Sequence, residues 1–295
     1  MSPTPVERLA RYFRPLRTRQ GVLARAALGT PDADDGALAS RLADGLAAEL
    51  RPDGSVGGAV VPTIWRGQEL LDLGRGQDDP AVARILAWLL ERQGKPGAYG
   101  AGCDKERHAQ RVCEHWMGGF FATASATERL APITVPNGKV FRAEPAARFA
   151  VSCLALGVAL RAGLLQRPAI RQHLESLRTL AEQWTEWTGF FAPDVILGGL
   201  HALALGGPDY RPTVETLVEL VAAHQGGDGE WPNADLFLAL EALVASGGPR
   251  ARAAVRRAAP ALAERQRPDG SFGAMAREER ALIGLRALVW AEQAL

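Results

Sequence analysis

The sequence predicts an all-α protein built as a single (α/α)6 toroid of about six helical hairpins. A glycine-containing phrase returns with glycines at positions 54, 97, 138, 189, 229 and 270, which marks a repeat of about 40 to 50 residues. Half-polar and fully apolar helical segments alternate between these phrases. Runs of alternating β-branched residues, which would indicate strands, are absent from the sequence.

The repeated phrase has the chemistry of a sharp turn between two helices. It reads QGGDGEW at residues 225–231, QRPDGSF at residues 266–272 and RPDGSV at residues 51–56, with weaker copies around the other three glycines. Glycine reaches positive φ without steric cost, and Pro-Asp-Gly favours a turn. The glutamine falls in the last turn of the preceding helix, where its amide can satisfy free backbone groups. Six unrelated glycine loops are the alternative, and the shared offsets favour a true repeat.

The predicted helices alternate between an outer, half-solvated type and an inner, buried type. After a helix at residues 5–28 and one that runs from the acidic residues 32–35 to residue 50, the outer helices are predicted at 80–92, 168–187, 213–224 and 250–265. The inner helices are predicted at 60–73, 144–161, 194–205, 235–245 and 279–294. A helix that is apolar on every side is buried on every side. Hairpins of this kind must stack on their neighbours, and six of them can close into a ring.

A length of 295 residues allows one large domain or two ordinary ones, and the repeats favour one closed array. Residues 1–30 are expected to form a helical extension with a basic face, and residues 31–295 to form the repeats of one toroid. The 47% of hydrophobic residues can fill a sizeable core, and a net charge of +1 predicts no nucleic-acid partner. No apolar run is long enough for a transmembrane segment, while contact with a membrane surface stays open. Three cysteines make no disulfide framework, which favours the cytoplasm.

The phrases at residues 225–231 and 266–272 resemble the QW motifs of squalene-hopene cyclases, and related turns occur in the β subunits of protein prenyltransferases. The resemblance covers roughly residues 35–295 and implies an α/α toroid with an apolar central cavity, where isoprenoid chains bind. This chain has the length of one toroid, whereas triterpene cyclases carry two. The resemblance therefore implies a terpene cyclase-like or prenyltransferase-like enzyme with a small apolar, isoprenoid-type substrate, although a fold does not decide an activity.

The acidic stretch DADD at residues 32–35 is similar to the DxDD motif of class II terpene cyclases. That similarity implies Asp34 as a proton donor, because a carboxyl group held protonated by its neighbours is a strong general acid. However, residues 35 and 79 lie 19 and 18 residues before the first two repeat glycines. Both acidic pairs therefore mark the start of an outer helix, where aspartates cap free amides. Position favours capping, and the class II cyclase with Asp34 as its acid is the alternative.

A second constellation lies between residues 103 and 116. Two thiols and two imidazoles form a plausible tetrahedral Zn²⁺ set: Cys103, His108, Cys113 and His115. Protein prenyltransferases hold zinc with an Asp-x-Cys pair followed by aromatic residues, and Cys113 before Trp116 resembles that pair, although Arg111 stands at the aspartate position. A core thiol beside a hydrogen-bonded histidine is one alternative. Acid/base or thiol chemistry without a metal is another.

Polar residues shortly after the turns are expected to surround one mouth of the ring. They are Glu144, Arg148, Asp194, His201, Asp235 and Glu278. The catalytic candidates, as acids, bases or carboxylate clamps, are Glu114, Arg148, Asp194 and Asp235. The candidate substrate-binding aromatic residues are Trp65, Trp116, Phe149, Phe191 and Phe237. Helix capping by the aspartates and ordinary core packing by the aromatic residues are the structural alternatives.

Two classes of function remain at this point. The first is the isoprenoid-binding enzyme, with chemistry at residues 103–115, assisted by Asp194 and Asp235 and by a Zn²⁺ ion that polarises an oxygen or activates a thiolate. The second is a non-catalytic toroid that binds a lipid or a partner and carries a structural zinc.

Overall fold

The fold is an all-α toroid of two concentric layers of helices. The computed structural model describes residues 3–93, 130–187 and 193–293. In these ranges the outer layer contains α1 (Pro5–Phe13), α3 (Asp35–Ala48), α5 (Pro80–Glu91), α8 (Pro168–Ala181), α10 (Arg211–Ala223) and α12 (Gly248–Arg265). The inner layer contains α2 (Arg19–Ala27), α4 (Val60–Asp72), α7 (Glu144–Arg161), α9 (Asp194–Ala204), α11 (Leu236–Ser246) and α13 (Arg277–Glu292). The all-α toroid predicted from the sequence is confirmed.

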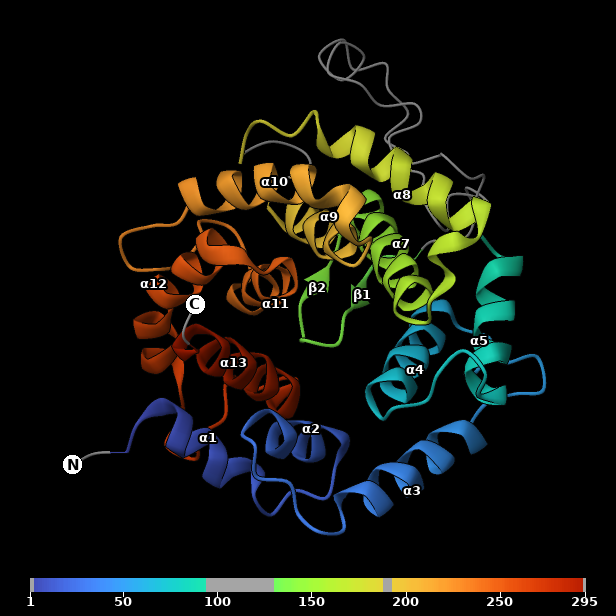
Figure 1. Ribbon diagram of the computed structural model, residues 1–295, viewed down its shortest axis with the longest axis horizontal. Helices are drawn as coiled ribbons and strands as arrows, with labels where there is room; N and C mark the ends of the chain where they lie inside the picture. Colours follow the sequence, from blue (N-terminus) through green and yellow to red (C-terminus); the bar gives the residue numbers. More distant parts are fainter. Residues whose placement is uncertain (1–2, 94–129, 188–192, 294–295) are drawn as a thin grey trace.

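The inner helices pack side by side in a closed ring. Each contacts the next in the order α2, α4, α7, α9, α11 and α13, and α13 packs in turn against α1 and α2 (Figure 1). Residues 1–30 had been expected to form an extension outside the repeats. Instead, α1 and α2 are the hairpin that completes the ring. The physical reason is that α13 would otherwise leave one buried face uncovered.

The glutamine turns dock each hairpin onto the next outer helix. The side-chain amide of Gln225 donates to the carbonyl oxygens of Gly229 at 2.8 Å and of Ala254, on α12, at 2.9 Å. Arg257 on α12 donates back to the Gln225 oxygen at 2.9 Å. A Cβ atom on Gly229 would stand 2.3 Å from the Arg257 carbonyl oxygen, so only glycine allows this approach.

The last turn repeats this arrangement on the first helix of the chain. The Gln266 amide donates to the carbonyl oxygens of Gly270 and of Pro5, both at 3.1 Å, and Arg8 donates to the Gln266 oxygen at 2.6 Å. A Cβ atom on Gly270 would stand 2.5 Å from the Arg8 carbonyl oxygen. The last turn therefore docks onto α1 in the same way that the turn before it docks onto α12.

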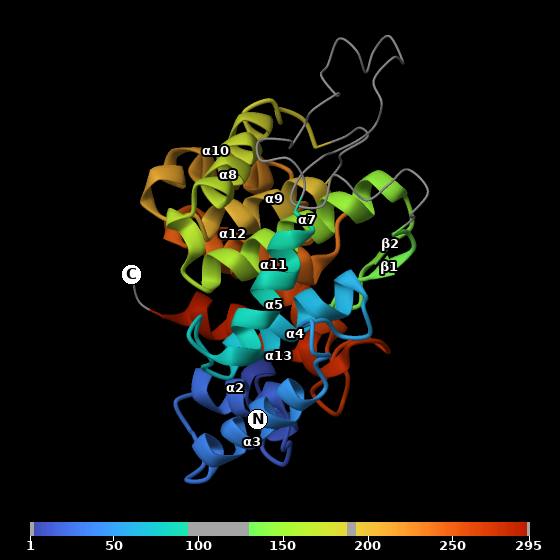
Figure 2. The ribbon, with the colours of Figure 1, turned by 90° about the vertical axis from the view of Figure 1, so that its right-hand side faces the viewer.

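A short antiparallel hairpin covers the end of the ring at which the inner helices begin. Strands β1 (Ile133–Thr134) and β2 (Val140–Phe141) are joined through Gly138, which has a φ of 83° (Figure 2). The Lys139 ammonium group pairs with Asp194 on α9 at 2.6 Å, and Arg280 on α13 donates to the Asn137 carbonyl oxygen at 2.6 Å. The weak repeat copy around Gly138 is thus a strand turn rather than a turn between helices. Among the described helices, none combines the length and the apolarity that a bilayer crossing needs.

Candidate functional site: a cavity through the ring

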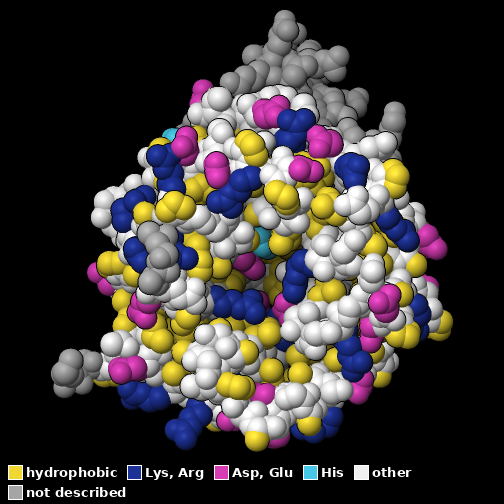
Figure 3. Space-filling model, in the orientation of Figure 1, with side chains coloured by type: hydrophobic (Ala, Val, Ile, Leu, Met, Phe, Trp, Pro, Cys, Tyr) yellow, Lys and Arg dark blue, Asp and Glu magenta, His cyan; other side chains and the backbone are white. Residues whose placement is uncertain are grey.

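Two adjoining hollows lie on the axis of the ring. The first lies beneath the strand hairpin and is lined there by Phe141, Cys153 and Leu238. The second lies toward the end of the ring at which α4, α7, α9 and α11 end, and it reaches Arg161 and Arg286. Both share a middle layer made of Trp65, Gln68, His201, Glu241, Glu279 and Ile283. Figure 3 shows the hollow at the ring centre, bordered by basic and acidic side chains with a histidine inside.

Helical spacing explains which side chains reach this cavity. On α9, the lining residues are Asp194, Gly198, His201 and Leu205, separated by four, three and four positions. Residues three or four apart share one face of a helix. That face of α9 points toward the axis of the ring. Leu197, Leu200 and Leu203, on its other faces, are fully buried.

Glu241 is a carboxyl group inside the wall of the cavity. Its pKa is raised to about 7, mainly by burial and also by the nearby Glu279 carboxylate, against the opposing charges of Arg286 and Arg161. Asp72 acts in the same direction as Glu279. The Glu241 side chain is only partly exposed, because it faces the cavity and not the bulk solvent. Glu241 therefore holds its proton close to neutral pH and can donate it.

His201 lies on the adjacent helix α9 and faces the same middle layer. Its pKa is lowered to about 4, mainly by burial and also by the positive charge of Arg161. Its imidazole is therefore neutral at the pH at which Glu241 is still protonated. The His201 imidazole makes no hydrogen bond with any described residue, so one of its nitrogens is available to a bound molecule. A neutral acid and a neutral base thus face one enclosed space.

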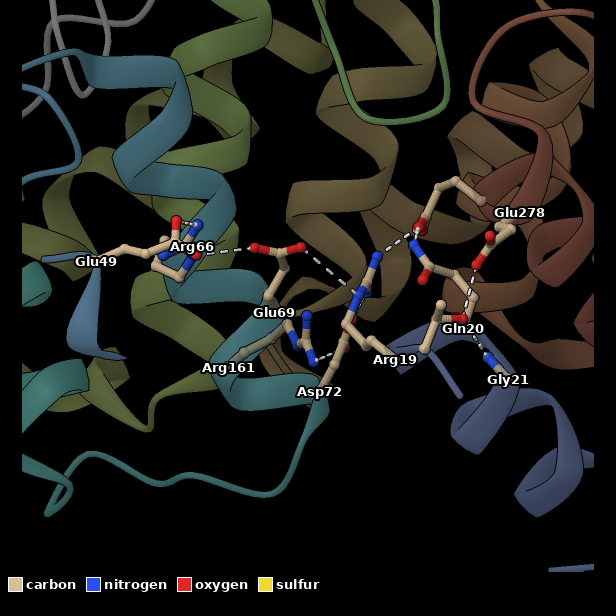
Figure 4. A network of polar contacts seen from close by, with 11 residues as sticks. Arg19, Gln20, Gly21, Glu49, Arg66, Glu69, Asp72, Arg161 and Glu278 are labelled. Atoms are coloured by element: carbon tan, nitrogen blue, oxygen red, sulfur yellow. Dashed lines mark hydrogen bonds and ion pairs between the residues drawn. The ribbon is translucent and has the colours of Figure 1, made fainter. Parts of the chain in front are cut away.

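A charged network around Arg19 joins α2 to α4 and α13 at the middle layer (Figure 4). The Arg19 guanidinium pairs with Asp72 and Glu279 and lies 4.0 Å from Glu69. It also lies over the ring of Trp65, 5.0 Å from its centre. Asp72 accepts a second bond from Arg161 at 2.6 Å. Arg19 therefore holds Glu279 at the middle layer, and Glu279 in turn disfavours ionisation of Glu241.

The candidate site residues predicted from the sequence occupy different places. Asp194 and Trp65 line the cavity. Burial raises the pKa of Asp194, although Lys139 opposes the shift. Asp235 caps α11, accepting from the amides of Phe237 and Leu238, and pairs with Arg280. That is the capping alternative considered for it.

Three further candidates lie within the layers of the protein. Arg148 is 3% exposed and pairs with Glu144 one turn earlier on α7 at 2.7 Å. The Phe149 ring packs edge-on against Trp184, and the Phe237 ring packs edge-on against Phe272. The Phe149 and Phe237 rings therefore pack in the hydrophobic core. The remaining candidates lie outside the described residues: Cys103, His108, Cys113, Glu114, His115, Trp116 and Phe191.

Asp34 is not placed to protonate a molecule in the cavity. It stands before the first residue of the outer helix α3, its side chain is 52% exposed, and it forms an ion pair with Arg17. That hydrogen bond from Arg17 lowers the pKa of Asp34, which is the opposite of a held proton. Asp34 also makes no side-chain cap, whereas Asp79 caps α5 through the amides of Ala81 and Val82. The position at a helix start was correct for both acidic pairs, and the cap forms only at the second.

Sequence reasoning missed Glu241, although a signal was present. Helix α11 reads LFLALEALVAS, and Glu241 is its only charged residue. A lone carboxyl group in a helix that is otherwise buried all round is costly unless it has a purpose or a partner. A single carboxyl group is a weaker signal in the sequence than a cluster of polar residues such as DADD or the cysteine–histidine stretch.

The comparisons with known proteins bear on the fold. No known family's sequence profile and no curated protein sequence matches this chain. Among solved structures, it is similar to the type II terpene cyclase MstE from Scytonema, in complex with its substrate geranylgeranyl dihydroxybenzoate. The two share 16% sequence identity with a TM-score of 0.52, over 96% of this chain and 85% of that chain. The chain therefore has a terpene cyclase-like fold.

Proposed function

We propose that the protein is a terpene cyclase-like enzyme that isomerises an unsaturated isoprenoid-type substrate by proton transfer within the central cavity. One observation carries the proposal: Glu241 and His201 face the same enclosed space from adjacent inner helices. The apolar lining beneath the strand hairpin suits a hydrocarbon chain, and Trp65 offers an aromatic ring to a developing positive charge. The likeness in fold to a structure that holds a geranylgeranyl compound supports the same substrate class.

The reaction balances with these two groups alone. The Glu241 carboxyl group gives its proton to one carbon of a double bond, so that a C–H bond forms and the neighbouring carbon becomes a cation. A second double bond of the same chain attacks this cation and closes a ring. His201 then removes a proton from the carbon next to the final cation, which restores a double bond. The product is an isomer of the substrate, and the proton returns from His201 to Glu241 through solvent.

The test uses heavy water. The protein is incubated in D2O with geranylgeraniol and with geranylgeranyl dihydroxybenzoate as probes, and the products are examined by mass spectrometry. We expect a product of the substrate's composition that carries one deuterium on carbon. Glu241→Gln should reduce its formation by about 10²–10⁴-fold, the usual contribution of a general acid.

Glu215→Gln is the matched control, because Glu215 is an exposed carboxylate on α10 that pairs with Arg211. It should leave the rate unchanged. Product without deuterium, or equal rates for Glu241→Gln and Glu215→Gln, would exclude Glu241 as the initiating acid.

Zinc at Cys103, His108, Cys113 and His115 stays a prediction from the sequence, since these residues lie outside the described ranges. Metal analysis of the purified protein tests it directly. If the four residues form a site, we expect about one Zn²⁺ per chain in the wild type and none in Cys103→Ala/Cys113→Ala. A zinc content equal in both proteins would contradict the prediction.

A further inference from the structure

The two ends of the cavity differ in chemistry. Beneath the strand hairpin the wall is mostly apolar, with Phe141, Leu154 and Leu238. At the other mouth the wall carries Arg161, the last residue of α7, and Arg286, which lies in the second half of α13. A molecule that fits both ends is an amphiphile, with its chain under the hairpin and its polar head between the arginines.

No described residue forms an ion pair with Arg286, whose positive charge acts on the nearby Glu241. The Arg286 side chain is exposed at the mouth and also makes no hydrogen bond with any described residue. Two neighbouring carboxylates, those of Asp72 and Glu279, form ion pairs with Arg19 instead. Arg161 shares Asp72 with Arg19 and also faces the mouth. Positive charge at this mouth is therefore available to an anion.

We infer that Arg161 and Arg286 bind an anionic head group, a phosphate or a carboxylate, and that the substrate is an isoprenoid chain bearing such a head. This inference rests on the proposed function, because it names the substrate of the same cavity. A guanidinium group presents paired donors that match both kinds of anion.

The spacing of the site supports this orientation of the substrate. Glu279 in the middle layer and Arg286 at the mouth are separated by seven residues on α13, which is about 10 Å along a helix axis. An amphiphile held by its head at Arg286 therefore carries its chain past Glu241 and His201 toward the apolar end.

Binding measurements test the inference without relying on turnover. Farnesyl phosphate, farnesoic acid and farnesol are titrated into the whole protein by calorimetry, each below its micellar concentration. We expect both anions to bind about tenfold or more tightly than the alcohol, as a charge-assisted contact allows. Arg286→Gln and Arg161→Gln should each remove most of this preference while the affinity for farnesol stays unchanged. Arg286→Lys should restore part of it.

Arg250→Gln is the control, since Arg250 is an exposed cation on α12 that pairs with Glu219 away from the cavity. It should change none of the three affinities. Equal affinity for the anions and the alcohol, or a preference that survives in Arg286→Gln and Arg161→Gln, would overturn the head-group site. A preference for only one anion would identify the head as that kind.

The failure of this inference is distinguishable from failure of the proposed function. Deuterium incorporation that depends on Glu241, together with indifference to the head group, overturns the head-group site alone. Arginine-dependent anion binding with no deuterium incorporated from any probe overturns the proton-transfer chemistry and leaves the binding site standing.

Discussion

At the scale of single residues, Glu241 and His201 exchange their usual order of acidity. An unperturbed carboxyl group loses its proton before an imidazolium does, yet inside the ring Glu241 has a pKa of about 7 and His201 a pKa of about 4. Burial is the main cause for both, because it disfavours whichever form is charged. Between these two values, each group is in the neutral form that the proposed reaction needs.

The rate should therefore depend on pH with two limbs. We expect activity to fall above about pH 7 as Glu241 ionises and to fall below about pH 4 as His201 becomes protonated. His201→Asn should reduce the rate across the plateau and remove the acid limb. Initial rates across this range measure both effects, with circular dichroism at each pH to separate unfolding from titration. An alkaline limb that persists in Glu241→Gln would contradict the assignment.

The Glu241 carboxyl group should lower the free energy of unfolding once the pH is high enough to ionise it. Its pKa rises from 4.5 in a model compound to about 7 on folding, so the unfolded chain releases this proton at a lower pH than the folded chain does. Its contribution to stability is therefore complete below about pH 4.5 and is lost as the pH rises to about 7. Glu241→Gln should raise the free energy of unfolding at pH 8 by roughly 1–3 kcal/mol, with little gain at pH 4. Urea titrations at the two pH values measure this, and an equal effect at both would contradict it.

At the scale of elements, the turns were more predictable than the site. The phrase around Gly54, Gly229 and Gly270 has a local cause, because each glycine adopts positive φ and lies against the next outer helix. Local causes leave a pattern in the sequence. The first hairpin, α1 and α2, could not be recognised in the same way, since residues 14–18 contain neither the glycine nor the aromatic residue of the phrase. The cavity wall depends on which faces of distant helices meet, and that is not a local property.

Gly270→Ala tests the role of these turns. Its φ of 92° and the 2.5 Å approach of a Cβ atom to the Arg8 carbonyl oxygen both oppose a side chain. We expect a loss of about 1–3 kcal/mol in the free energy of unfolding, read from the urea midpoint. Gly227→Ala is the control, because a Cβ atom there would meet nothing within 4 Å. Equal midpoints for the two variants would show that the contact with α1 contributes nothing.

At the scale of the whole molecule, the ring is complete only because its first hairpin meets its last. Deletion of residues 1–28 should therefore expose the buried face of α13 and leave Asp72 and Glu279 without Arg19. We expect the truncated chain to lose its cooperative thermal transition and to aggregate, as measured by circular dichroism and size-exclusion chromatography. A dispensable extension would instead leave both the transition and the elution volume of the monomer unchanged.

The docking of Gln266 on Pro5 and Arg8 joins residues about 260 positions apart. During synthesis, the first hairpin leaves the ribosome long before its final partner has been translated. Contacts at such a sequence distance slow folding, since a long loop must close before they form. The nascent chain must therefore remain soluble as an unclosed arc, and the polar outer helices that follow each buried one can protect it during that wait.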